Sequence, residues 1–100
     1  MFVPTPYFYM TRAIHEELPE EHQQFILKFL LQHHLQLTDY LQIFEFYIEN
    51  DEQWLIQRQE QPNRETTIYV QLHNAQPIHR KVWAMNQGSK DVIILFPEDY

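Results

Sequence analysis

The chain has 100 residues, of which 44% are hydrophobic and 15% aromatic, so it is long and apolar enough for a single domain over residues 1–100. Its single glycine excludes glycine-rich phosphate loops, and the absence of cysteine excludes disulfides, thiolate metal sites and a cysteine nucleophile. The formal net charge of −7 disfavours nucleic-acid binding, which depends on clustered lysines and arginines.

The N-terminal segment predicts a cytoplasmic protein. It has no basic region followed by an apolar core, so it does not read as a signal peptide. No apolar run in the sequence approaches the roughly 20 residues that a membrane-spanning helix needs. We therefore expect a protein of the cytoplasm without a membrane segment.

The first part of the chain predicts a strand followed by one long helix. Residues 7–14 read YFYMTRAI and favour a strand. Residues 19–37 predict an amphipathic helix, because Pro19 suits a first turn and Glu20 and Glu21 complement the positive end of the helix dipole. A second apolar row lies beside the main apolar stripe and consists of Leu27, Leu31 and Leu35.

The rest of the chain shows the two-residue period of strands. It predicts five of them, at residues 40–49, 53–60, 66–73, 79–85 and 90–96. Asn50 and Asp51 predict a hairpin turn between the first two, and Gly88 lies in the turn between the last two. The predicted order is β-α-β-β-β-β-β. We expect an α+β fold with one main helix packed on a strongly curved, mostly antiparallel sheet of about six strands.

The strand at 40–49 is apolar on both of its faces. Leu41, Ile43 and Tyr47 share one face, and Phe44 and Phe46 share the other. Six strands form a sheet roughly 25–30 Å wide, whereas a helix about 10 Å across covers two or three of them. We therefore expect the sheet to curl and a second chain to cover the remaining apolar surface. The leading prediction is a non-catalytic protein-interaction module, acting as a homodimer through the leucine row or the hairpin at 40–60.

Four charged residues form a second candidate site. In the predicted hairpin, residue 45 pairs with about residues 56–58, so Arg58 can reach Glu45 across the two strands. Arg12 and Glu60 would join them at the mouth of a half-barrel that binds or hydrolyses a small molecule. The alternative interpretation is a solvent-facing ion pair, which contributes under about 1 kcal/mol.

A third hypothesis places a nucleic acid on the basic residues of the second half. Arg80, Lys81 and Trp83 would form the contact, together with Arg64 and Lys90. The net charge disfavours this hypothesis. The six histidines lack the spacing of known metal sites, so the sequence predicts neither a metal nor a cofactor.

Several short motifs occur in the order in which one known family has them. They are YMTR (9–12), DYLQIFE (39–45), IQRQEQP (56–62), PI (77–78), KVW (81–83) and LFPEDY (95–100). Together they resemble a small family of Gram-positive bacteria that is catalogued as domain of unknown function 960. Ala13 and Gln57 depart from the family pattern, which has a glycine and a histidine there. The resemblance implies a bacterial cytoplasmic protein and carries over no catalytic residue.

Overall fold

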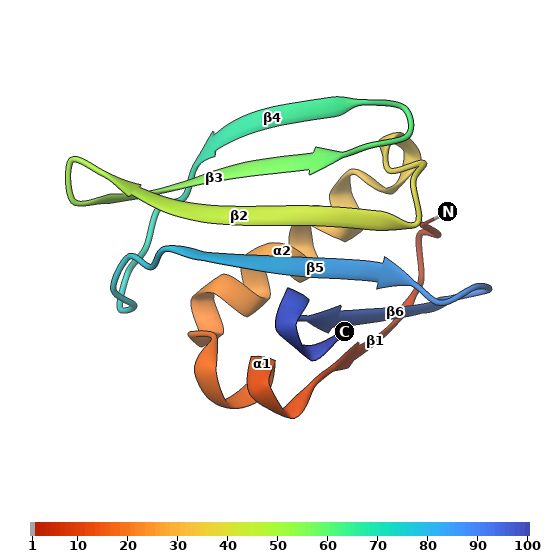
Figure 1. Ribbon diagram of the computed structural model, residues 1–100, viewed down its shortest axis with the longest axis horizontal. Coiled ribbons are helices and arrows are strands. Elements are labelled where there is room, and N and C mark those ends of the chain that lie inside the picture. The colour runs from red at the N-terminus through yellow and green to blue at the C-terminus, as the bar shows by residue number, and fades with distance from the viewer. Residues whose placement is uncertain (1) are drawn as a thin grey trace.

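The computed structural model describes residues 2–100 as one six-stranded sheet with helices packed against it (Figure 1). This arrangement confirms the predicted α+β class. Within the described residues, no helix has the length and apolarity that a membrane span requires. In chain order the elements are β1 (Tyr7–Met10), α1 (Arg12–Glu17), α2 (Glu20–Gln32), the 3-10 turn η1 (His34–Gln36), β2 (Leu41–Glu49), β3 (Glu52–Gln59), β4 (Arg64–Tyr69), β5 (Arg80–Asn86), β6 (Asp91–Leu95) and the 3-10 turn η2 (Pro97–Asp99).

The strands lie in the order β1-β6-β5-β2-β3-β4, so β1 and β4 are the two edges of the sheet. Four of the five pairings are antiparallel, and the pairing of β1 with β6 is parallel. Short connections predict that sequence neighbours pair, and this holds for β2–β3–β4 and for β5–β6. It fails between β4 and β5, because the connection after β4 crosses to the other side of β2.

The predicted strand at 7–14 is wrong beyond Met10. The chain instead enters α1, since the Thr11 hydroxyl accepts a hydrogen bond from the Ile14 backbone N–H at 3.3 Å and caps the helix. The Ile14 side chain is fully buried in the core. The long helix begins as predicted but ends at Gln32, after which η1 carries the chain to the buried Leu37.

The turn between β2 and β3 has the backbone that its residues predict. Asn50 and Asp51 have φ angles of 52° and 63°, and Glu49 pairs with Glu52 across the hairpin. Two successive positive φ angles match the twist of the flanking strands, and Asn and Asp tolerate them best after glycine. The hairpin and its register are therefore confirmed.

Helix α2 packs across one face of the sheet (Figure 1). Phe44 and Phe46 of β2 are fully buried beneath it, and the ring of Phe44 meets that of Phe29 edge to face at 5.6 Å. The buried side chains of α2 are His22, Ile26, Phe29 and Leu30. They recur at helical spacing, so the apolar stripe that the sequence predicts is the one that faces the sheet.

The opposite face of the sheet carries a smaller apolar cluster. Ile43, Met85 and Leu95 are buried there, outside the main core. Trp83 pairs with both Ile43 and Leu95, and its ring meets Tyr100 at 5.8 Å. This cluster explains why the strand at 40–49 is apolar on both faces.

Candidate functional site

The structure does not bring together the four charged residues of the predicted half-barrel site. Arg58 and Glu45 do form the predicted ion pair, with Nη1 to Oε1 at 2.9 Å. It lies on the face away from α2, because Glu45 alternates with the buried Phe44. Arg12 is on α1 and pairs with its neighbour Glu16, and Glu60 is exposed after β3. The predicted small-molecule site is therefore not formed by these residues.

The predicted leucine row is interrupted. Leu27 is half-buried and packs against the core, whereas Leu31 and Leu35 are 42% and 84% exposed. Helix α2 ends at Gln32, so Leu35 lies in η1 and no longer follows the helical spacing. The three leucines do not make one continuous ridge.

The basic residues of the nucleic-acid hypothesis point to different faces of the sheet. Arg80 lies over the ring of Phe96 and forms ion pairs with Glu17 at 3.0 Å and Glu98 at 3.1 Å. Lys81 and Trp83 alternate with the buried Val82, on the face away from α2. Arg80 is thus neutralised and separated from the other two residues, so the three form no common surface.

The histidines form no metal site within residues 2–100, where no group of three His, Asp or Glu side chains could hold an ion. His22 is fully buried against Phe46, and its Nε2 lies 2.8 Å from Gln53 Oε1. Burial lowers the pKa of His22, so the neutral ring donates from Nε2. Its role is to join α2 to β3.

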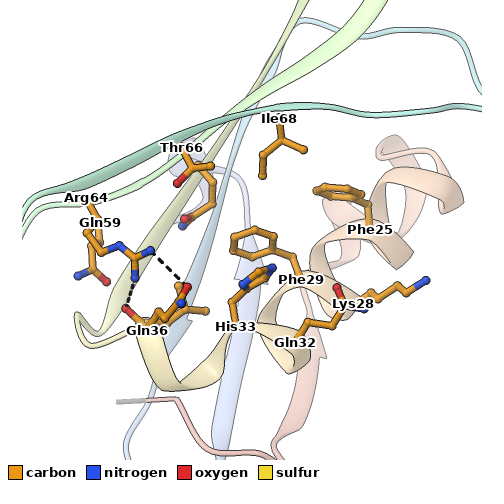
Figure 2. A pocket seen from close by; sticks show the side chains of 12 residues that line it. Phe25, Lys28, Phe29, Gln32, His33, Gln36, Gln59, Arg64, Thr66 and Ile68 are labelled. Carbon is orange, nitrogen blue, oxygen red and sulfur yellow. Dashed lines mark hydrogen bonds between the residues drawn. The ribbon is translucent and has the colours of Figure 1, made fainter.

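A pocket of about 450 Å³ lies between α2, η1 and strands β3 and β4 (Figure 2). This volume is in the range of sites for small organic ligands or side chains. A second hollow of about 270 Å³ shares Phe25 and Lys28 with it and extends to Leu72. We call the two together the α2–β4 groove. The main pocket is lined by Phe25, Lys28, Phe29, Gln32, His33, Gln36, Leu37, Gln57, Gln59, Arg64, Thr66 and Ile68.

Polar contacts hold the groove at both ends. At one end the Glu21 carboxylate accepts hydrogen bonds from the backbone N–H groups of His73 and Asn74, each at 2.7 Å, and from that of Ala75. At the other end Arg64 donates to the backbone oxygen of Gln36 at 3.1 Å and to its Oε1 at 3.3 Å (Figure 2). These contacts tie α2 to the connection after β4 and tie η1 to the first residue of β4, and the pocket lies between them.

Aromatic rings of α2 form one wall of the pocket. The Phe25 and Phe29 rings stack at 6.3 Å, and the ring of His33 lies 4.3 Å from that of Phe29. Ile68 and Thr66 extend from β4 on the opposite side (Figure 2). These rings make an apolar wall, which suits the flat or branched apolar part of a ligand.

The main pocket contains cations but no carboxylate. Lys28 and Arg64 are in its lining, which includes neither Asp nor Glu. Within residues 2–100, Arg64 is the arginine without a carboxylate partner, whereas Arg12, Arg58 and Arg80 each form ion pairs. In a chain of net charge −7, this leaves a local positive site at the pocket.

A chain of buried glutamines forms the floor of the pocket. Gln57 donates to Gln42 Oε1 at 2.8 Å, and Gln42 donates to Gln59 Oε1 at 2.8 Å. Gln59 in turn donates to the Thr38 hydroxyl at 3.1 Å. Gln57 is only 5% exposed, and no donor from the described part of the chain reaches its Oε1. That oxygen is an acceptor available to a ligand.

The sequence contains a signal for this floor, although none of its glutamines was among the predicted site residues. Strand β3 reads EQWLIQRQ, and Gln53, Gln57 and Gln59 recur on the same face as Leu55. These amides share a face with an apolar residue, and the other face of the strand is also partly apolar. Such a pattern indicates buried, hydrogen-bonded amides rather than a face exposed to solvent.

The Glu21 contacts predict how the stability of the protein depends on pH. Three backbone N–H donors, with that of Ala75 first, lower the pKa of Glu21 from 4.5 to about 2. The folded state thus favours the ionised form of Glu21 more than the unfolded chain does. The resulting contribution to the free energy of unfolding is complete above pH 4.5 and declines as the pH falls toward 2. We expect Glu21→Gln to lower the free energy of unfolding at neutral pH, with a difference from the wild type that narrows below pH 4.5.

Urea denaturation at a series of pH values measures this effect. The matched control is Glu20→Gln, in the same first turn of α2 but exposed. If the free energies of unfolding of Glu21→Gln and the wild type differed by the same amount throughout the acid range, the lowered pKa of Glu21 would be contradicted.

Comparison with known proteins identifies relatives of the chain. The sequence model of the family described as "Staphylococcal protein of unknown function" (DUF960) matches residues 8–98, which confirms the resemblance. A crystal structure of a protein of unknown function from Enterococcus faecalis has the same fold, with a TM-score of 0.80 and 18% sequence identity. The match covers 100% of this chain and 98% of that chain. None of the curated proteins matches the sequence.

Proposed function

Because the chain belongs to the DUF960 family, whose description gives no activity to transfer, we propose from its own geometry that it is a non-catalytic binding module. Its α2–β4 groove takes a ligand that has an apolar body and an anionic group. The proposal keeps the small-molecule binding of the second hypothesis and moves it from the site of Arg12, Glu45, Arg58 and Glu60 to the α2–β4 groove.

The observation that carries the proposal is the pairing of aromatic rings with one arginine that forms no ion pair within residues 2–100. Phe25 and Phe29 provide apolar contact area, and Arg64 lies at the end of the same pocket without a carboxylate partner in the described residues. Arg64 donates two hydrogen bonds to Gln36 and keeps the other N–H groups of its guanidinium for a ligand. Guanidinium groups bind carboxylates and phosphates strongly, because both partners are charged and their geometries match.

The other polar groups of the pocket also favour recognition over chemistry. Lys28 adds a second positive charge at the rim, and Gln57 Oε1 offers one acceptor at the floor. A few fixed polar groups in an apolar pocket orient a ligand and give it specificity.

Binding of a simple aromatic carboxylate tests the proposal. We expect 4-phenylbutyrate to bind the wild type more tightly than the uncharged 4-phenylbutanol does. Arg64→Gln should weaken binding of the carboxylate by about tenfold, because one charge-assisted hydrogen-bonded contact is lost. It should leave the affinity for the alcohol unchanged. Titration calorimetry, or NMR titration if affinities are millimolar, measures both ligands.

The control variant is Arg12→Gln, since Arg12 is exposed on α1 and pairs with Glu16. It should bind both ligands as the wild type does. Equal affinities of the wild type for the acid and the alcohol, or an Arg64→Gln variant that binds the acid normally, would show that the groove does not recognise an anion.

A further inference from the structure

We infer that the occupant of the α2–β4 groove is an extended polypeptide segment of a partner protein, which pairs with the free edge of β4. This inference rests on the proposed function and specifies the class of ligand. Three observations support it: the unpaired backbone of β4, the length of the groove beside it, and the limited protection of β4 as an edge strand.

The free backbone groups of β4 follow from its register with β3. Val70 N–H donates to the Gln53 backbone oxygen at 2.9 Å. The residues of β4 that hydrogen-bond to β3 are therefore the alternate residues counted back from Val70, all at even-numbered positions. The N–H and C=O groups of Glu65, Thr67 and Tyr69 consequently point away from β3. In the described part of the chain β4 is the last strand of the sheet, and these three residues are exposed. They form a template for one more strand.

The groove is as long as the strand beside it. Its two hollows share Phe25 and Lys28, and together they run from Arg64 to Leu72. The six residues of β4 span about 20 Å at the rise of an extended chain. A compact small molecule fills one hollow, whereas an extended segment of about six residues follows the whole groove.

Strand β4 also has few of the features that usually block pairing at an edge, since its charged residues are confined to its first two positions, Arg64 and Glu65. Between Arg64 and Tyr69 it has no proline, no lysine and no bulge in its pairing with β3. Its central residues are Thr66, Thr67 and Ile68, which are β-branched and favour the extended conformation. The other edge, β1, has only four residues and follows a segment with two prolines.

The groove specifies the side chains of the segment. Alternate side chains of an added strand face the groove, about 6.6 Å apart. One of them lies beside Arg64 and is acidic, because that end of the pocket is positive and has no carboxylate in its lining. The side chains two and four residues along lie beside Thr66 and Ile68, facing the Phe25 and Phe29 rings, and are apolar. The partner therefore presents an acidic, an aromatic and an aliphatic residue at two-residue spacing, with the acidic residue at the end of the segment that lies beside Arg64.

Substitution of Thr67 by proline separates peptide pairing from simple anion binding. Because the Thr67 N–H points away from β3, Thr67→Pro keeps the β3–β4 hydrogen bonds and removes a donor to the added strand. Thr67→Val is the matched control that keeps the N–H. The probes are blocked pentapeptides with Asp first, Phe third and Ile fifth between threonines, in both chain directions, and 4-phenylbutyrate.

We expect the wild type and Thr67→Val to bind one of the two peptides more tightly than 4-phenylbutyrate. Thr67→Pro should bind that peptide about tenfold more weakly, because one backbone hydrogen bond to the peptide is lost and those beside it are weakened. It should bind 4-phenylbutyrate normally. Normal binding of the small probe also shows that the proline variant is folded.

Hydrogen exchange in the wild type gives a second readout that needs no variant. The peptide should slow exchange of the Thr67 and Tyr69 amides, and 4-phenylbutyrate should not. Binding of the small probe without binding of either peptide, or peptide affinity that Thr67→Pro leaves unchanged, overturns the inference while the proposed function stands. If the affinity for 4-phenylbutyrate does not depend on Arg64, the proposed function itself is overturned.

Discussion

Phe44→Ala is expected to lower the free energy of unfolding by about 3–5 kcal/mol, the range for removing a large aromatic side chain from a packed core. Phe44 is fully buried at the centre of the sheet, and its ring meets Phe29 of α2 edge to face. The loss combines the transfer energy of the ring with the cavity left behind, because helix and sheet cannot collapse fully into it. Urea denaturation followed by circular dichroism measures the change.

The control for this substitution lies on the same strand. Ile48 is 45% exposed, so Ile48→Ala should change the free energy of unfolding by less than about 1 kcal/mol. Similar losses at the two positions would contradict the assignment of Phe44 to the centre of the core.

Gln59→Leu is expected to cost about 3–5 kcal/mol even though leucine is the more apolar residue. Gln59 Oε1 accepts hydrogen bonds from the backbone N–H groups of Thr38 and Asp39, at 3.2 and 3.3 Å, and from Gln42 Nε2 at 2.8 Å. Leucine leaves these donors without their acceptor in a region where Asp39 and Gln42 are buried. Each buried donor left unpaired costs on the order of 1–3 kcal/mol.

The same substitution at an exposed glutamine isolates the effect of the lost acceptor. Gln76 is exposed in the connection after β4, so Gln76→Leu should leave the free energy of unfolding within about 0.5 kcal/mol of the wild type. If Gln59→Leu were neutral or stabilising, the glutamine chain would not be a structural part of the pocket floor.

Residue patterns over short distances predicted most of the elements. The hairpin at Asn50 and Asp51 follows from local turn chemistry, and the buried stripe of α2 follows from helical spacing. Both depend on neighbours in sequence. The short helix α1 was missed, because its cap at Thr11 interrupts a run that otherwise reads as a strand.

The long-range arrangement did not follow from the sequence. The crossing that places β5 beside β2 and the parallel pairing of β1 with β6 depend on how the whole sheet closes over α2. The grouping of the four charged residues did not follow from the sequence for the same reason, since Arg12 and Glu60 lie apart from the ion pair of Glu45 and Arg58. The homodimer through the leucine row or the hairpin at 40–60 stays a prediction.

Arg64 shows what can be found only in three dimensions. In the sequence it is one of seven basic residues, placed among the residues of a nucleic-acid hypothesis. In the fold it lies at the end of β4 beside an aromatic pocket of α2, with its carboxylate-bearing neighbour Glu65 on the other face of the sheet. The positive site arises from that separation.

An NMR titration of the amide groups with 4-phenylbutyrate tests the central claim most directly, because it locates the ligand on the protein. We predict saturable shift changes concentrated at residues that line the α2–β4 groove, with Lys28, His33, Arg64 and Ile68 among them. Shift changes concentrated around Ile43 and Trp83 on the opposite face, or no saturable change at any residue, would contradict it.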